Sequence, residues 1–150
     1  MKPIAGAAAL EQHVEQFAAL CRERGLALTH QRRIIYREML RMGGHPSPEA
    51  IYERVRAEIP SISLGTVYKN LKTFLEAGVL REVSLHHGTQ RLEANLEPHH
   101  HLVCTRCKSI FDIPEAEFDA SRLKRSFPRG FRIESISVEV HGLCAACAEN

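Results

Sequence analysis

Apolar residues in the first part of the chain recur at intervals of three and four, the period of amphipathic helices. Leu10, Val14, Phe17 and Cys21 form the first such stripe, and Gly25 follows it. This spacing predicts a helix with one buried face that ends before the glycine. Cys21 falls on the stripe, so we interpret it as a core residue and not as a reactive thiol.

Three further helices are expected before residue 80. Thr29 suits the N-cap of the second, and Ser47 followed by Pro48 marks the start of the third, because proline is tolerated at the first helical position. The fourth is predicted over residues 61–77, with Gly78 as its left-handed C-cap. Its apolar positions leave a polar outer face.

That outer face combines a glycine, hydroxyl groups, an aromatic ring and two cations, which suits insertion into a major groove of DNA. A solvated helix face is the alternative for a helix taken alone. The residues that we expect to contact DNA are Gly65, Thr66, Tyr68, Lys69, Lys72 and Thr73 on this helix, together with Arg32 on the second.

Beyond Gly78 the pattern changes to alternation. Residues 79–85 and 89–93 read as two strands joined by a turn at His86-His87-Gly88, which predicts a β-hairpin. Helices, a helix with a basic outer face and then a hairpin form the order of a winged helix-turn-helix. We therefore expect a DNA-binding domain over residues 1–93 and a second domain over residues 94–150 in an α+β protein.

The second domain carries two CxxC pairs, Cys104/Cys107 and Cys144/Cys147. Paired cysteines with this short spacing are typical of structural zinc, which would clamp the start of this domain to its end. A redox dithiol is the alternative, and it would require a CxxC at a helix N-terminus after a strand.

Three consecutive histidines precede the first pair. Alternation along an extended strand would place His99 and His101 on one side and His100 on the other. Two imidazoles on one side of a strand can bind one metal ion, whereas a histidine run in a loop would bind none. A strand over residues 109–113 bearing Asp112, a helix opened by Pro114 and a strand over residues 131–141 complete the expected domain.

Composition excludes a membrane protein, because no stretch approaches the roughly 20 apolar residues of a membrane span. The start of the chain also lacks the apolar region of a signal peptide, so we expect a cytoplasmic protein. Of the 20 Lys and Arg residues and 18 Asp and Glu residues, 11 and 8 lie in residues 1–80, which gives +3 there and −1 in the remainder. The basic excess therefore lies in the predicted DNA-binding half.

Four strings of residues together resemble the ferric uptake regulator (Fur) family across nearly the whole chain. They are SISLGTVYKNL at residues 61–71, RLE at residues 91–93, HHHLVCTRC at residues 99–107 and GLCAAC at residues 142–147. The resemblance implies a homodimeric, metal-dependent transcriptional repressor of operator DNA, with a winged helix followed by a small α/β dimerisation domain that holds a four-cysteine Zn²⁺ site.

The resemblance also implies a regulatory metal site at the hinge between the domains, formed by His45, Glu93, His99, His101 and Asp112. Three imidazoles and two carboxylates suit Fe²⁺ or Mn²⁺ and contain no thiolate that would trap softer metals. Ligands from both domains would let metal binding close the hinge.

The four-cysteine site together with Asp112 resembles the peroxide-sensing, PerR-like branch. For that branch the resemblance implies Fe²⁺-dependent oxidation of a ligand histidine, here His45 or His99. Glu93 departs from the Asp frequent at this position in the branch, and an iron- or manganese-responsive repressor without peroxide sensing is the alternative. A metalloenzyme and a zinc-containing redox chaperone are the competing classes. We expect no enzyme, because no acid–base motif accompanies the metal ligands.

Overall fold

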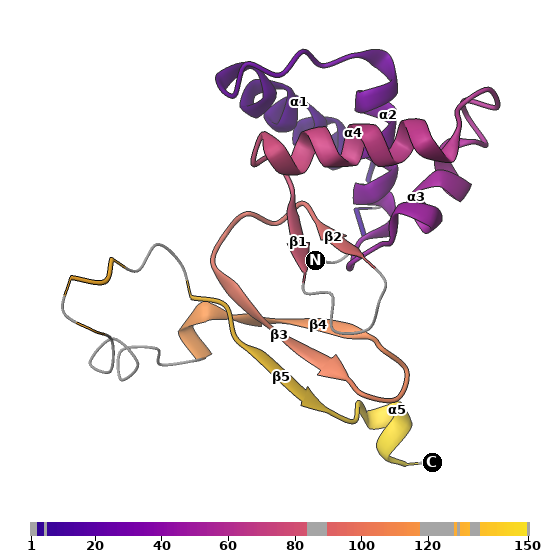
Figure 1. The fold of residues 1–150 in the computed structure, drawn as a ribbon. Helices are drawn as coiled ribbons and strands as arrows, with labels where there is room; N and C mark the ends of the chain where they lie inside the picture. Colours follow the sequence, from indigo (N-terminus) through magenta and orange to yellow (C-terminus); the bar gives the residue numbers. More distant parts are fainter. Residues whose placement is uncertain are drawn as a thin grey trace. The chain divides into compact units, whose positions relative to one another are not determined.

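The computed structural model describes residues 3–4, 6–83, 90–117, 128, 130–132 and 136–149, and the chain divides into two compact units, Met1–Leu96 and Glu97–Asn150. The first unit contains four helices and a two-stranded antiparallel sheet (Figure 1). Its elements are α1 (Ala7–Glu23), α2 (His30–Met42), α3 (Pro48–Val55), α4 (Leu64–Glu76), β1 (Arg81–Val83) and β2 (Arg91–Glu93). The turn predicted at residues 86–88 lies outside the described residues.

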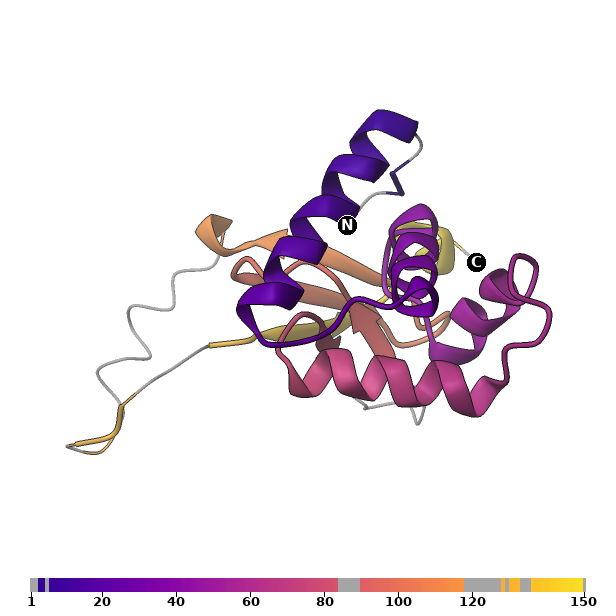
Figure 2. The same cartoon turned by 90° about the horizontal axis from the view of Figure 1, so that it is seen from above.

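The helices of the first unit pack around one apolar core, and Figure 2 shows them from above. The Phe17 ring of α1 stacks on Tyr36 of α2 at a centroid distance of 3.6 Å and meets Phe74 of α4 edge-on at 5.2 Å. Cys21 is fully buried in this core, as the helical stripe predicted. Burial of side chains from every helix fixes how α4 lies on the remainder of the unit.

Side-chain oxygens begin the last three of these helices, because the first backbone N–H groups of a helix have no partner within it. Thr29 caps α2 and Ser47 caps α3, as the sequence predicted. The helix predicted over residues 61–77 begins later than expected: Ser63 is its N-cap and accepts a hydrogen bond from the Thr66 N–H at 3.1 Å. Gly78 follows α4 with φ of +66°, a conformation that favours glycine.

The second unit is built on a three-stranded sheet of order β4-β3-β5. Its elements are β3 (His99–Cys104), β4 (Ile110–Pro114), the 3₁₀ turn η1 (Glu115–Glu117), β5 (Glu139–Gly142) and the short helix α5 (Ala145–Ala148). The central strand β3 pairs antiparallel with β4 and parallel with β5. The first strand of the unit, β3, and the last, β5, are therefore neighbours in space. Because they run parallel, their C-terminal ends bring the two CxxC pairs to the same end of the sheet.

Two predictions for this unit differ from the structure. Pro114 is the last residue of β4 and is followed by the 3₁₀ turn η1, while the remainder of the helix predicted after Pro114 lies outside the described residues. The strand expected over residues 131–141 is limited to β5, and residues 131–132 are not in it. Helix α5 was not predicted, because four residues are too few to show a helical period.

Within the described residues, no helix is long and apolar enough to cross a bilayer.

Replacing Ser63 by alanine tests the cap of α4. The Ser63→Ala variant loses the acceptor for the Thr66 N–H, so we expect unfolding free energy to fall by about 1 kcal/mol. Urea unfolding followed by circular dichroism measures this change. Ser61→Ala, an exposed serine two residues earlier, is the matched control and should unfold like the wild type. Equal stability of both variants would contradict the role given to the Ser63 hydroxyl.

Candidate metal centres and nucleic-acid face

The four cysteines of the second unit converge on one point. Their sulfur atoms all lie within 4.8 Å of one another, and the Cys107 and Cys144 sulfurs are 3.7 Å apart. Sulfurs bound to one tetrahedral Zn²⁺ are separated by about 3.8 Å, because the Zn–S bond is about 2.3 Å. The spacing observed between the two CxxC pairs therefore fits a zinc ion held by all four thiolates.

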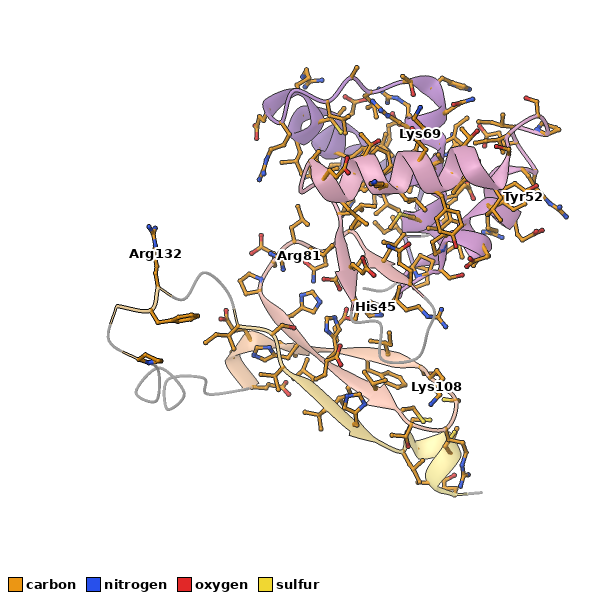
Figure 3. The ribbon with its side chains drawn as sticks, in the orientation of Figure 1. His45, Tyr52, Lys69, Arg81, Lys108 and Arg132 are labelled. Carbon is orange, nitrogen blue, oxygen red and sulfur yellow. The ribbon has the colours of Figure 1, made fainter. Side chains whose placement is uncertain are left out.

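Backbone and side-chain contacts fix the two cysteine loops against each other. The Thr105 N–H donates to the Gly142 carbonyl at 2.8 Å, and the Arg106 guanidinium donates to the Cys147 carbonyl at 2.6 Å. Lys108, which is labelled in Figure 3, closes the first loop with φ of +63°. These contacts join residues about 40 positions apart in the sequence, so the cysteine geometry depends on the pairing of β3 with β5.

Hydrogen bonds among the four cysteines shift the pKa values of their thiols in opposite directions. Hydrogen bonds from the Cys144 and Cys107 backbone N–H groups lower the pKa of Cys104 to about 5. Hydrogen bonding with the Cys144 thiol raises the pKa of Cys147 to about 12, because that contact favours the protonated form. A divalent cation at the centre would favour the thiolate at every position.

One feature of the structure favours a redox dithiol and another argues against it. Cys144 is the N-cap of α5 directly after β5, which is the position that a redox CxxC would need. The close contact, however, joins Cys107 with Cys144 across the two pairs, and all four sulfurs share one centre. A dithiol needs two sulfurs, whereas this arrangement uses four, so the geometry favours zinc.

In the first unit, His45 and Glu93 form a buried pair of metal-binding side chains. The His45 Nε2 and Glu93 Oε2 atoms are 3.3 Å apart, and both side chains are 4% exposed. The Leu92 N–H donates to the Pro46 carbonyl at 3.1 Å, which holds the loop carrying His45 against β2 (Figure 3). Neighbouring ligands of an octahedral ion are about 3 Å apart, so one cation could bind both atoms.

In the second unit, the rings of His99 and His101 are adjacent on one face of β3, with centroids 4.7 Å apart. The His99 Nδ1 lies 2.8 Å from the Glu97 carbonyl oxygen. Because a carbonyl only accepts, this contact places the His99 proton on Nδ1 and makes Nε2 the nitrogen that could bind a metal. The strand geometry predicted for His99 and His101 is therefore observed.

The sheet register places two carboxylates beside His101. Asp112 of β4 and Glu139 of β5 are its direct partners on the two flanking strands, and Asp112 is exposed. The Glu139 carboxylate also lies 3.4 Å from His141 Nε2. Sequence reasoning singled out Asp112 and missed Glu139, because only the parallel pairing of β5 with β3 brings it next to His101.

The six residues of α4 that are predicted to contact DNA divide into an exposed and a half-buried group. Gly65, Tyr68, Lys69 and Lys72 are exposed on α4, while Thr66 and Thr73 are half-buried (Lys69 is labelled in Figure 3). The Tyr68 hydroxyl donates to Glu49 of α3, and Lys72 lies 3.7 Å from Glu76. The exposed group therefore forms one outer face, as predicted from the helical period.

Arg32 belongs to neither group. Its guanidinium donates to the Asn70 amide oxygen at 3.0 Å and to the Ala27 carbonyl at 2.5 Å. Asn70 lies on α4, so Arg32 connects α2 with that helix. Its contact with DNA stays a prediction, and the observed contacts add a role in holding α4.

Loss of one cysteine tests the zinc assignment. A Cys104→Ser variant lacks one of four thiolates, so we expect purified protein to lose its zinc and the second unit to lose protection from hydrogen exchange. Elemental analysis and exchange mass spectrometry measure the two effects. Cys21→Ala removes a cysteine from the core of the first unit and should keep one zinc per chain. Full zinc content in the Cys104→Ser variant would exclude the four-thiolate site.

The proteins that are similar to this chain include one curated relative and two solved structures. The peroxide-responsive repressor PerR of Staphylococcus epidermidis is 27% identical over 140 residues, which cover 93% of each chain. A zinc-bound manganese uptake regulator is 31% identical with a TM-score of 0.64, covering 85% of this chain and 98% of its own. A zinc uptake regulator complexed with zinc and DNA is 25% identical with a TM-score of 0.68, covering 93% and 95%.

These three proteins are named for three different signals, although each is similar to this chain over most of its length. A family model, described as the ferric uptake regulator family, also matches residues 23–141, which include α2 to α4, β1 to β4 and the first CxxC pair, Cys104/Cys107. On that match, the chain belongs to the ferric uptake regulator family.

Proposed function

We propose that this protein is a homodimeric transcriptional repressor that binds operator DNA when a regulatory Fe²⁺ or Mn²⁺ ion is bound. The observation that carries the proposal is the distribution of donors between the two units. The first unit contributes His45 and Glu93 at 3.3 Å, and the second contributes the adjacent imidazoles of His99 and His101. Each pair alone offers two ligands, which is too few for a specific site.

Joining both pairs on one ion would give a nitrogen and oxygen site suited to Fe²⁺ or Mn²⁺. Asp112, the cross-strand partner of His101, is the fifth ligand in this proposal. Metal binding then favours the arrangement of the two units in which all ligands meet. Because a ligand shifts an equilibrium only by its differential affinity, this shared site gives the metal a direct effect on where the DNA-binding helix is held.

The outer face of α4 supports the DNA-binding part of the proposal. Tyr68, Lys69 and Lys72 are exposed there, and Gly65 near the start of the helix allows close approach of the backbone. Lysine contacts with phosphate supply affinity, and side chains that reach base edges supply specificity. The similar zinc uptake regulator was solved with DNA, which supports the same role here.

An apolar row across the sheet of the second unit supports the homodimer. Leu102 of β3 lies between Phe111 of β4 and Val140 of β5, and with Leu143 these side chains are 42–51% exposed among the described residues. Soluble monomers rarely expose contiguous apolar patches of this kind. We propose that a second copy of the chain covers this row. The zinc ion, next to it at Cys104 and Cys144, would stabilise the sheet that carries it.

Peroxide is the signal that we propose, because the Staphylococcus epidermidis relative is a peroxide-responsive repressor. Fe²⁺ held by these ligands would activate hydrogen peroxide, with the ligand imidazole as the group that is oxidised. In the net reaction one peroxide oxygen replaces a hydrogen on a ligand imidazole carbon and the other leaves as water. His45 and His99 are the candidate imidazoles. Oxidation of either ring would weaken the metal site and so release DNA.

Repression in response to manganese or iron alone is the second candidate, and Glu93 is the observation that favours it. Glutamate reaches one methylene farther than the aspartate frequent in peroxide sensors, and its carboxylate lies 3.3 Å from His45. A carboxylate that occupies more of the coordination sphere leaves less room for peroxide at the ion. The similar manganese uptake regulator represents this type of response.

Removing His99 tests the regulatory site. His99→Ala lacks one of the proposed ligands, so we expect Mn²⁺ to lose its effect on DNA affinity, a decrease of at least tenfold in metal-activated binding. The probe is a duplex selected from a random pool with Mn²⁺-loaded wild type, and binding is read by fluorescence anisotropy. His141→Ala changes a histidine on the same sheet and should keep both zinc and activation. Normal activation of the His99→Ala variant would refute the proposed site.

Brief exposure to peroxide separates the two candidate signals. Fe²⁺-loaded protein treated with a low dose of hydrogen peroxide should gain one oxygen atom, +16 Da, on His45 or His99. Peptide mass spectrometry measures the gain, and Mn²⁺-loaded protein given the same dose is the control. Unmodified histidines together with loss of DNA binding only on chelation would instead establish the iron- or manganese-responsive repressor.

A further inference from the structure

The Tyr68 side chain on the outer face of α4 is held by a residue of another helix. Its hydroxyl donates a hydrogen bond to Glu49, which lies in the first turn of α3. Tyr68 is 40% exposed and Glu49 is exposed, so the contact adds little to the core. It does restrict the ring, because a phenol whose proton is committed to a carboxylate has one favoured direction.

Glu49 is in turn tied to the loop of a proposed metal ligand. Only three residues separate it from His45, and Ser47 between them is the buried N-cap of α3. The Pro46 carbonyl accepts from the Leu92 N–H at 3.1 Å, one residue before Glu93 on β2. The segment that leads from His45 into α3 is therefore short. Ser47 ties it to the first turn of α3, and the Pro46 carbonyl ties it to β2, the strand that carries Glu93.

Arg91 of β2 closes the connection. Its guanidinium donates to the His45 carbonyl at 3.4 Å. The hydrogen bond from Tyr68 is the main cause that lowers the pKa of Glu49; hydrogen bonds from the Glu49 backbone and the Ser47 side chain follow, and the positive charge of Arg91 makes the smallest contribution. Glu49 therefore remains ionised. Its carboxylate is bonded to Tyr68 of α4 and lies in the field of Arg91, whose guanidinium is bonded to the His45 carbonyl.

We propose that Glu49 is a positioning residue that couples the regulatory metal to DNA recognition within the first unit, by orienting Tyr68. This inference rests on the proposed function, since it assumes that His45 and Glu93 bind the regulatory ion and that α4 reads DNA. It adds a second route by which the metal acts, independent of the arrangement of the two units.

The coupling follows from the contacts. An ion that binds His45 and Glu93 fixes the loop against β2, and the loop fixes the first turn of α3 with Glu49. Glu49 accepts the hydrogen bond from the Tyr68 hydroxyl, so the phenol oxygen would meet DNA as an acceptor for the amino groups of adenine or cytosine. Without the ion the loop is held less firmly, and Tyr68 loses part of this orientation before it meets DNA.

A double-mutant cycle tests the proposal. For each variant, the affinity for the selected duplex is measured with Mn²⁺ bound and after chelation that leaves zinc in place, and the ratio of the two is the metal activation. The variants are Glu49→Ala, Glu49→Gln, Tyr68→Phe and the double variant Glu49→Ala with Tyr68→Phe. Glu53→Ala is the matched control, because Glu53 is an exposed glutamate of the same helix that pairs with Arg56.

We expect Glu49→Ala and Tyr68→Phe each to reduce metal activation about three- to tenfold, the size of one hydrogen bond. The double variant should lose no more than the larger single loss, because both changes remove one interaction. Glu49→Gln should retain activation, since its amide oxygen still accepts the hydroxyl proton. Glu53→Ala removes the same charge near DNA and should alter both affinities equally, which leaves the ratio unchanged.

Unchanged activation in Glu49→Ala, additive losses in the double variant or failure of Glu49→Gln to restore activation would overturn the coupling. These outcomes differ from a failure of the proposed function. If the wild type showed no metal activation, the repressor proposal itself would be wrong. If the wild type responded and Glu49→Ala responded equally, only the role of Glu49 would be lost.

Discussion

The hydrogen bond between the Leu92 N–H and the Pro46 carbonyl is the constraint on which the function of the first unit depends. It holds the loop before α3 against β2 and so brings His45 within 3.3 Å of Glu93, although 48 positions separate them in the sequence. The same loop delivers the chain to the Ser47 cap and the start of α3. One backbone contact thus fixes both the His45 and Glu93 pair, which we propose to bind the regulatory metal, and the start of α3, which contacts α4 through Glu49 and Tyr68.

The second unit depends on a different kind of bond. Among its described residues the buried apolar side chains are Val103 and Cys104, so the part of the sheet that the structure describes has little apolar core of its own. Four thiolates on one zinc ion would add folding free energy at the end of the sheet where β3 and β5 pair. Burial stabilises the first unit, and coordination would stabilise the second, in keeping with the apolar helical stripes before residue 80 and the two CxxC pairs after residue 100.

Sequence periodicity was sufficient for most of the fold but not for the contacts that give the sites their geometry. Helical stripes and Ser or Thr caps predicted α1 to α4, because local burial and capping decide helices. The predicted start of α4 was two residues too early. Ser61 and Ser63 both have a hydroxyl that suits an N-cap, and the sequence does not distinguish them. Glu139 and Glu49 were missed, since each gains its role from a partner, His101 or Tyr68, that only the folded chain places beside it.

Separation of donor types keeps the two metals distinct in one small chain. Thiolates bind zinc tightly and closely surround it, whereas imidazoles and carboxylates bind Fe²⁺ or Mn²⁺ more weakly and release it. A structural ion must stay while a regulatory ion must exchange, so mixing the donors would damage both roles. The Nδ1 contact of His99 with the Glu97 carbonyl fixes the direction of one ligand of the proposed regulatory site. A donor that is already oriented loses less entropy on binding, which strengthens its contact with a metal.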